Sequence, residues 1–467
     1  MSKNLRNGLI AITVGLILWF IPTPAGLKPQ AWHLVAVFAA TILGFILQPL
    51  PIGAVAFIAL GTAGLLKVLT PAQILAGFGD TTMWLIVSAF IFAKGFIKTG
   101  LGKRIAYRIM GAIGDSSLKL GYALVISDLI ISPATPSNTA RGGGIMYPIV
   151  RSLAAAFGSE PGESSRKIGA YLMKTAFQGN TITSAMFLTA VAPNSLCAAM
   201  AMQVAKVDLS WGTWALAGIV PGLISLAIVP YVLYKIYPPE IHKTPEAKEI
   251  AHKELEKMGP MSIGEKVVAG VFLLALILWA TSSFTKINAT VVAIVCVGLM
   301  LIGQAIEWKD VLEEKGAWDT LIWMGGLISL AGALNKVGVI AWFAKLVAGS
   351  LVGISWQVAL GILLVAYMYS HYAFASLSAH VTAMYAAFLA VAVGAGAPPF
   401  LAAMSLGVLS ALMGGITHYA TGPAPIYYGA GYVPQGTFWS LGFVVSVINM
   451  VVFLGIGSFW WKLAGLY

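Results

Sequence analysis

Long apolar runs separated by short polar stretches make up most of this chain. The runs fall at 8–22, 31–48, 52–69, 83–99, 119–134, 143–157, 168–202, 213–236, 265–283, 289–303, 319–335, 338–352, 357–375, 381–394, 400–433 and 438–461. A helix needs about 20 apolar residues to cross the ~30 Å hydrocarbon core of a bilayer. The pattern therefore predicts an all-α polytopic membrane protein with about 11 transmembrane helices.

Two pairs of apolar runs have members that are short for a crossing. They are 119–134 with 143–157, and 357–375 with 381–394, and a small polar stretch separates the members of each pair. This arrangement predicts two re-entrant hairpins, each entering the membrane and leaving by the same side. Irregular backbone at that depth is tolerated only inside the protein or beside a water-filled cavity.

Composition narrows the class of protein further. The chain has 467 residues, of which 59% are hydrophobic and only 10% are charged, and its net charge is +11. Soluble domains carry about 25% charged residues, so a cytosolic enzyme, a disordered chain and a nucleic-acid-binding protein are excluded. Cys197 and Cys296 lie in apolar surroundings and indicate neither a disulfide framework nor a metal site, and we expect no cofactor.

The distribution of basic residues predicts the orientation. A hydrophilic stretch at 238–264 divides the chain near its middle and is expected to contain a surface helix. With an inner N-terminus, nineteen of the 28 Lys and Arg residues, Lys174 among them, fall on the inner side, seven fall outside, and Lys94 and Arg141 fall at membrane depth. Basic residues gather on the cytoplasmic side. The alternative explanation is that this charge difference arises by chance from where the boundaries of the spans are placed.

The two hairpin tips resemble each other and indicate an internal repeat. The tips read Ser137-Asn138-Thr139-Ala140-Arg141 and Ser376-Leu377-Ser378-Ala379-His380. Each is followed about forty residues later by a second polar stretch, 178–184 in the first half and 414–423 in the second, which we interpret as broken helices. With five crossings per half, the second copy is inverted relative to the first. Inverted repeats with broken helices are typical of secondary transporters, whose sites lie near the midplane.

Broken helices inside a membrane can bind anions. Their ends expose unpaired N–H groups and the positive end of the helix dipole. Short polar side chains at the tips can donate hydrogen bonds to carboxylate oxygens, and two such loops would suit a small molecule with a carboxylate at each end. The alternative is that these hydroxyl groups bond back to their own helices. The candidate substrate-binding set is Ser137, Asn138, Thr139, Arg141, Asn180, Ser376, Ser378, His380, Thr417, His418 and Thr421.

Arg141 and His380 are the most informative members of this set. A charge at membrane depth costs at least about 2.5–3.5 kcal/mol and is expected to have a function. Arg141 either holds an anionic substrate or pairs with Asp128, the one nearby acidic candidate. His380 is either a second cation or a neutral, hydrogen-bonded ring. His418 lies in a break and is a better candidate than His371, for which packing is expected.

These motifs resemble those of the divalent anion/sodium symporter superfamily, the INDY-type dicarboxylate transporters. The similarity is strongest to the branch of 2-oxoglutarate/malate translocators and citrate/succinate antiporters. It covers nearly the whole chain and is carried by QPLPIGAV at 48–55, WLIVSAFIFAKGFIKTGLGKRIA at 84–106, PSNTAR at 136–141 and THYATGPAPIYYGAG at 417–431.

The resemblance implies a homodimer in which a mobile domain moves as an elevator against a scaffold. The implied ranges are 1–118 and 265–356 for the scaffold helices, 119–236 and 357–467 for the transport domain with its inner and outer hairpins, and 237–264 for a cytoplasmic linker. The Ser-Asn-Thr motifs of the family would bind the two carboxylates. The first copy is intact here, whereas the second has Leu377 in place of Asn.

The resemblance and the two basic residues together predict a function. We expect an antiporter that exchanges C4–C5 dicarboxylates (2-oxoglutarate, malate and succinate) without sodium, because Arg141 and His380 follow the motifs and can supply the positive potential of a bound cation. A sodium-coupled dicarboxylate symporter is the first alternative. A membrane-embedded enzyme lacks a catalytic motif here, and an anion channel would not show stimulation by internal substrate. We expect a cell membrane location, typical of the bacterial inner membrane, with no nucleic acid partner.

Overall fold

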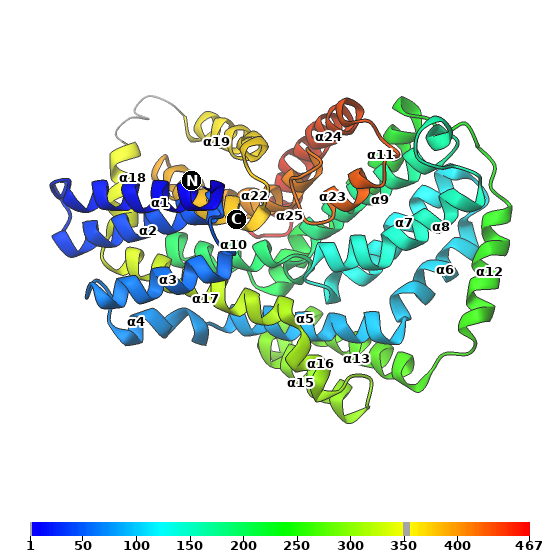
Figure 1. Ribbon diagram of the computed structural model, residues 1–467, viewed down its shortest axis with the longest axis horizontal. Helices are drawn as coiled ribbons and strands as arrows, with labels where there is room; N and C mark the ends of the chain where they lie inside the picture. Colours follow the sequence, from blue (N-terminus) through cyan, green and yellow to red (C-terminus); the bar gives the residue numbers. More distant parts are fainter. Residues whose placement is uncertain (1, 349–354) are drawn as a thin grey trace.

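The computed structural model describes residues 2–348 and 355–467, which form an all-α protein (Figure 1). The helices of the first half are α1 (Lys3–Phe20), α2 (Pro29–Leu47), α3 (Ile52–Leu65), α4 (Pro71–Leu75), α5 (Thr81–Thr99), α6 (Leu101–Ile113), α7 (Ser117–Ile131), α8 (Tyr147–Ala156), α9 (Gly169–Met186), α10 (Ala192–Ala205) and α11 (Trp211–Ile236). After α12 (Glu246–Met258), the second half has α13 (Ile263–Ala280), α14 (Ser282–Thr285), α15 (Ala289–Ile302), α16 (Trp308–Glu313), α17 (Lys315–Lys336), α18 (Val339–Ala348), α19 (Trp356–Ser370), α20 (Leu377–His380), α21 (Ala386–Gly394), α22 (Pro399–Leu412), α23 (Ala424–Gly429), α24 (Gln435–Met450) and α25 (Gly457–Leu463).

Eight helical segments among the described residues are long and apolar enough to cross a membrane. They are Pro29–Leu47, Thr81–Thr99, Ser117–Ala134, Trp211–Ile236, Ile263–Ala280, Lys315–Lys336, Leu377–Gly394 and Gln435–Leu463, and α3, α15 and Pro399–Gly415 are shorter apolar helices. The prediction of a polytopic helical membrane protein is therefore confirmed. The number of actual crossings and their orientation stay predictions.

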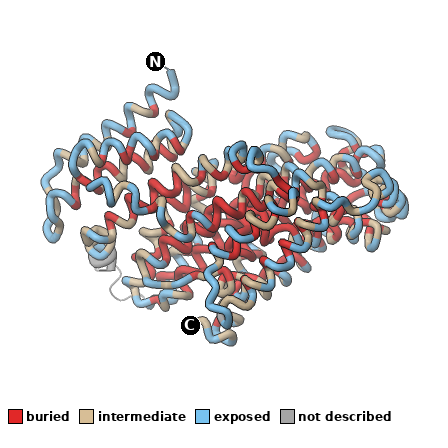
Figure 2. Tube along the Cα trace, turned by 90° about the horizontal axis from the view of Figure 1, so that it is seen from below, coloured by how far each residue is buried: buried red, intermediate tan, exposed pale blue. Residues whose placement is uncertain are grey.

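Buried residues gather in the middle of the molecule (Figure 2), and α9, α10 and α22 each contribute a long run of them. All residues of α9 are buried, whereas α1 buries only Asn7 and Ala11. Large apolar side chains lie instead on the outer surface, for example Leu65 with 83% of its area exposed and Ile302 with 81%. Such faces are stable when lipid, which is as apolar as leucine, surrounds them.

Both predicted hairpins are present as helix–turn–helix units. Hairpin 1 (117–156) consists of α7, a 3-10 turn at Ser132–Ala134, a tip that is non-helical at 135–137 and helical from Asn138, the π-helical segment Ala140–Met146 and α8. Hairpin 2 (356–394) consists of α19, a 3-10 turn at His371–Ala373, a tip, α20, the π-helical segment Val381–Tyr385 and α21. The two units thus share their order of backbone conformations, as the internal repeat predicts.

One of the two predicted helix breaks is misplaced. The stretch 178–184 is a continuous part of α9, and the backbone leaves the helix only at 187–191, which we call break 1. Phe187 and Val191 are extended there, and Pro193 begins α10. Two hydroxyl groups of this stretch bond back to α9 itself, since Thr181 donates to the carbonyl of Gln178 and Ser184 donates to the carbonyl of Asn180. The second predicted break, at 414–423, is present, and we call the stretch between α22 and α23, 413–423, break 2.

The predicted surface helix of the linker is α12, which packs on α6 (Figure 1, right). A buried ion pair fixes the end of this linker, because Arg104 Nε lies 2.6 Å from Glu265 Oε1 and its Nη1 donates to the carbonyl of Gly259 at 2.9 Å. The predicted scaffold range 265–356 includes 349–354, which lie outside the described residues.

Candidate functional site

The tips of the two hairpins are capped in the same way. Ser137 Oγ accepts a hydrogen bond from the N–H of Ala140 at 3.1 Å, and Ser376 Oγ accepts one from the N–H of Ala379 at 3.3 Å. A side-chain oxygen at this position satisfies one of the free N–H groups at the start of a helix. The two serines of the repeated motif therefore have the same local role.

The first tip contacts break 2. Asn138 Nδ2 donates to Thr421 Oγ1 at 2.8 Å, and both residues are almost fully buried. Gly422 lies so close to Thr139 that a Cβ at this glycine would be 1.9 Å from the Thr139 Oγ1. The structure thus brings together Asn138, Thr139 and Thr421 of the predicted set, which are 283 residues apart in sequence at their widest.

Arg141 follows this tip, and its side chain is fully buried. Its Nε donates to Asp128 Oδ1 at 3.0 Å. Its remaining donors reach the carbonyl groups of Thr135 (2.9 Å) and Ala190 (2.9 Å) and the hydroxyl groups of Thr183 (3.4 Å) and Ser184 (2.8 Å). A guanidinium has five N–H donors, so each has an acceptor within the protein. The structure shows one of the two alternatives, the pair with Asp128, and contact between Arg141 and the substrate stays a prediction.

Asn180 belongs to the same buried network. Its Nδ2 donates to Asp128 Oδ1 at 3.1 Å, and Thr183 donates to the other oxygen of this carboxylate. The Oδ1 of Asn180 is buried and has no hydrogen-bond partner among the described residues. Asn180 was predicted to lie in a helix break, but it holds Asp128 from within a continuous helix.

His380 lies at the matching position of hairpin 2 and has neutral partners. Its Nδ1 lies 2.8 Å from the Nδ1 of His371, whose Nε2 lies 2.8 Å from the carbonyl oxygen of Ala420. A carbonyl oxygen only accepts, so Nε2 of His371 carries the hydrogen and its Nδ1 accepts from the Nδ1–H of His380. The rings of Phe374 and Tyr367 pack against His380. This arrangement matches the predicted alternative of a neutral, hydrogen-bonded ring.

The remaining candidates divide into packed and accessible residues. Thr417 is fully buried, and the Nδ1 of His418 accepts a hydrogen bond from Trp439 Nε1 at 2.8 Å, so this histidine is used in packing. By contrast, Ser376 and Ser378 at the second tip are only half-buried. At the first tip Asn138 is buried against break 2, but Ser137 and Thr139 are half-buried as well, so both tips present hydroxyl groups that a ligand can reach.

Comparison with known proteins identifies the family. The chain matches the model of the "Sodium:sulfate symporter transmembrane region" over residues 2–467. The chain belongs to this family. The putative malate transporter YflS of Bacillus subtilis is 54% identical over 98% of this chain and 96% of that protein. The chloroplastic dicarboxylate transporter 1 of Spinacia oleracea is 49% identical over 100% of this chain and 82% of that protein. The inner membrane protein YbhI of Escherichia coli is 39% identical over 99% of this chain and 98% of that protein.

The fold also has a counterpart among solved structures. The crystal structure of the YdaH transporter of Alcanivorax borkumensis superposes with a TM-score of 0.61, covering 99% of this chain and 98% of that chain at 11% identity. At this identity the similarity concerns the fold alone. Membership of the sodium:sulfate symporter family confirms the predicted resemblance and makes the chain a multi-pass member of a transporter family and not an enzyme.

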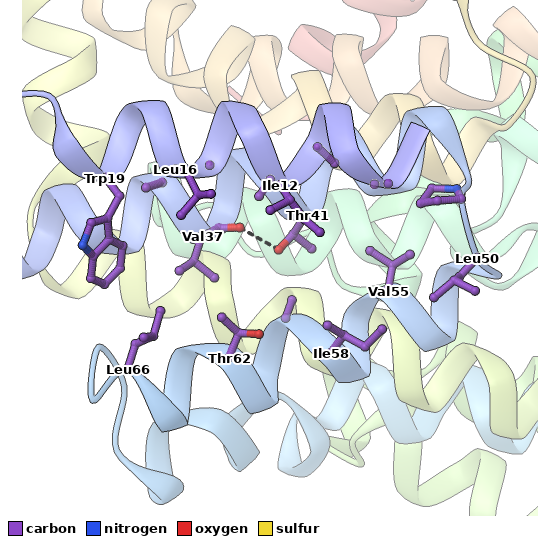
Figure 3. Close-up of a pocket in the computed structure, with 18 of the residues that line it drawn as sticks. Ile12, Leu16, Trp19, Val37, Thr41, Leu50, Val55, Ile58, Thr62 and Leu66 are labelled. Carbon is purple, nitrogen blue, oxygen red and sulfur yellow. Dashed lines mark hydrogen bonds between the residues drawn. The ribbon is translucent and has the colours of Figure 1, made fainter. Parts of the chain in front are cut away.

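Three cavities of this sodium:sulfate symporter fold bear on the site. One of them, of about 510 Å³, is mainly apolar and lies between α1, α2 and α3 (Figure 3). A second cavity, of about 310 Å³, lies between three elements: the 3-10 turn at Ala76–Gly79, the end of α10, and α17. The third, about 340 Å³, is lined by residues of the hairpin 2 tip, including Ser376. Of these three cavities, this one reaches a residue of the predicted site.

Lys174 is a residue whose environment the sequence did not indicate. The charge pattern assigns it to the inner flank, but it is only 1% exposed within α9. Its Nζ donates to the carbonyl of Phe438 at 2.9 Å and lies 3.6 Å from the centre of that phenyl ring. Lys174 thus ties the central helix to α24 through a carbonyl group and an aromatic ring. No pattern in the sequence distinguishes it from a flanking lysine.

Proposed function

We propose that this protein exchanges C4–C5 dicarboxylates, such as 2-oxoglutarate, malate and succinate, across the membrane without sodium coupling. The names of two relatives support the substrate class, since one is a putative malate transporter and another a chloroplastic dicarboxylate transporter. The high identity over nearly the full chain makes this a comparison between whole proteins rather than between shared segments.

The hydroxyl and amide groups at the tips support binding of a diacid. The first tip supplies Asn138 and Thr139, and the second supplies Ser376 and Ser378. Each of these side chains can donate to a carboxylate oxygen, and bonds to charged groups contribute about 1.5–3 kcal/mol. In this proposal each tip contributes to one end of the substrate.

The coordination of Arg141 is the observation that carries sodium independence. Its guanidinium is surrounded by one carboxylate, two carbonyl and two hydroxyl oxygen atoms from hairpin 1, α9 and break 1. Oxygen groups of these kinds are the ligands of hard metal cations. Arg141 therefore occupies a place that a dissolved cation could take, and it joins the tip to break 1 permanently. A carrier built in this way needs no sodium to complete the junction.

The charge of Arg141 does not account for exchange. Because Asp128 balances it, the expected penalty for crossing without substrate does not follow from this residue. Exchange rather than one-way transport is proposed from the resemblance to the antiporter branch. The neutral arrangement of His380 likewise supplies no fixed charge.

We extend the proposal to the motion and the assembly. Segments 119–236 and 357–467 would move together as an elevator against 1–118 and 265–356, in a homodimer in a bacterial inner membrane. The buried centre of α9, α10 and α22 supports this division, because the contacts of both hairpins converge on these helices. The name of the relative YbhI, an inner membrane protein, supports the location.

Counterflow in proteoliposomes tests the proposal. Purified protein is reconstituted with internal malate, and uptake of labelled 2-oxoglutarate, malate, succinate and citrate is measured in sodium-containing and sodium-free choline buffers. We expect uptake only with internal dicarboxylate and equal rates in both buffers. Uptake into empty vesicles that depends on sodium would contradict it.

Sodium-coupled dicarboxylate symport is the second candidate. The description of the family as sodium:sulfate symporters favours it. It predicts uptake into empty vesicles driven by an inward sodium gradient, and the same buffers therefore separate the two functions.

A further inference from the structure

The cavity at the tip of hairpin 2 brings together three distant parts of the chain. Its volume is about 340 Å³, within the range of about 300–1,000 Å³ that is common for small-molecule sites. One wall is the tip itself, at 373–376 with Ala379, and the others are the beginning of α1 and the end of α2. Residues of this tip therefore face the beginning of α1.

The chemistry of the lining favours an anion. Five of the eleven lining residues are polar: Lys3, Asn4, Asn7, Gln48 and Ser376. Lys3 is the one charged residue among the eleven, so its positive charge has no acidic neighbour in the lining. A lone cation with several amide and hydroxyl groups can stabilise a carboxylate group, which accepts hydrogen bonds from all of them.

The wall opposite the tip is held in place. Asn7 Nδ2 donates to the carbonyl of Leu47 at 2.7 Å and joins the first turns of α1 to the end of α2. Gln48 ends α2 in a left-handed conformation (φ 45°), with its N–H bonded to the carbonyl of Gly44. The polar groups that face hairpin 2 thus lie on α1 and at the end of α2, which a hydrogen bond joins.

The two other cavities do not offer this combination. The cavity of about 510 Å³ is lined mainly by apolar side chains of α1, α2 and α3, includes no charged residue and suits no anion (Figure 3). The cavity beside α17 has two lysines, Lys206 and Lys336, but Asp80 lies in the same lining. Neither includes a hairpin tip.

We propose that the cavity between Lys3 and Ser376 is a carboxylate subsite through which the dicarboxylate reaches hairpin 2. This inference rests on the proposed function, and it adds Lys3, Asn4 and Gln48 to the residues that contact the substrate. Lys3 supplies the counter-charge that the neutral His371–His380 pair does not provide. The amide groups of Asn4 and Gln48 supply further donors.

Replacement of Lys3 tests the subsite. We expect Lys3→Gln to raise the KM for malate about three- to tenfold with little change in kcat, since one charge-assisted contact in a partly solvated cavity is lost. The increase should shrink at high salt because exposed charges are screened. Arg6→Gln is the matched control: Arg6 is exposed and one turn away but does not line the cavity, and it should behave like the wild type. An unchanged KM in Lys3→Gln, or an equal effect of both variants, would overturn the proposal.

Thiol labelling gives an independent readout. Both native cysteines are buried, so an introduced cysteine dominates labelling by a charged thiol reagent. Ala375 is exposed and lines the cavity, and we expect malate to slow the labelling of Ala375→Cys. Glu256→Cys, on the exposed face of α12, should be labelled equally with and without malate. Absence of protection at position 375 in a protein that transports malate would refute the subsite alone.

Two further measurements separate a failure of the proposed function from a failure of the proposed subsite. If the wild type transports no dicarboxylate, the proposed function fails before the subsite is tested. If the Lys3→Gln effect disappears in vesicles of phosphatidylcholine alone, the occupant is an anionic lipid headgroup and the proposal is wrong. The same effect in vesicles with and without anionic lipid supports the substrate as occupant.

Discussion

Hairpin 1 holds its tip with a buried ion pair, whereas hairpin 2 holds its tip with two neutral imidazole rings. The backbones match closely, with a serine cap at each tip and a π-helical segment after it. The difference in how the tips are held lies at the fifth residue of the motif. There Arg141 bonds to Asp128 and to break 1, and His380 bonds to His371 and through it to break 2.

This difference teaches that a repeated motif need not have a repeated role. Break 2 covers part of the first tip, because Asn138 bonds to Thr421 and Gly422 packs against Thr139, although Ser137 and Thr139 stay half-buried. The second tip faces a cavity through Ser376. Moving the tip of hairpin 1 away from its neighbours would separate the buried charges of Arg141 and Asp128. Moving the tip of hairpin 2 would break only the hydrogen bonds of His371 and His380. We therefore expect hairpin 2 to be the easier one to move.

The largest effect is expected for Arg141→Ala. The substitution leaves Asp128 buried without its cation, and breaking a buried ion pair from one side costs about 3–5 kcal/mol. The thermal unfolding of the purified variant in detergent should show a large loss of stability, together with loss of exchange.

The double variant Asp128→Asn/Arg141→Gln is its control, because it removes both charges and should recover part of the stability. A single variant as stable as the wild type but inactive would show that Arg141 acts on the substrate after all.

A smaller effect is expected for Leu377→Asn, which restores the missing amide of the second motif. Leu377 is only 5% exposed and packs near Gly414. A buried amide without partners costs about 2–3 kcal/mol, so the variant should unfold at lower temperature and gain no affinity for malate. Leu377→Met keeps the apolar volume and should stay near the wild type. Tighter malate binding by Leu377→Asn would show that the two tips are equivalent.

The sequence predicted the hairpins because their signals are local. Short apolar runs, a capping serine and a following alanine fix where the chain turns, whatever surrounds it. The position of break 1 was missed because a polar run such as 178–184 is compatible with a buried helix once Thr181 and Ser184 bond back to it. Pro193 is the local signal that marks the true break, since proline is favoured at the start of a helix.

The partners of the charged residues could not be predicted in the same way. The sequence left open whether Arg141 pairs with Asp128 or binds an anion, and only the three-dimensional arrangement of α7, α9 and break 1 decides this. The same holds for Lys174, whose burial depends on α24, 264 residues away at Phe438. Long-range packing, and not local propensity, sets the environment of these groups.

A third effect concerns the neutral pair of hairpin 2. His371→Phe keeps an aromatic ring but leaves the carbonyl of Ala420 and the Nδ1 of His380 without this partner. We expect a loss of about 1–2 kcal/mol, clearly less than for Arg141→Ala, because no charge is stranded. Thermal unfolding of both variants side by side measures the ratio. A loss as large as that of Arg141→Ala would mean that the histidine pair carries a charge.

The smallest effect on stability is expected for Asn138→Ala, which removes one neutral hydrogen bond between the first tip and break 2. The bond to Thr421 contributes about 0.5–1.5 kcal/mol, so unfolding should shift slightly while the KM for malate rises, since the tip loses a donor to the substrate as well. Thr421→Ala and the double variant complete a cycle that isolates the coupling between the two side chains. If Asn138 serves only to close the tip, Thr421→Ala alone should raise the KM as much as Asn138→Ala does. A larger rise for Asn138→Ala would assign the excess to direct contact with the carboxylate, and an unchanged KM in both would place the substrate entirely at hairpin 2.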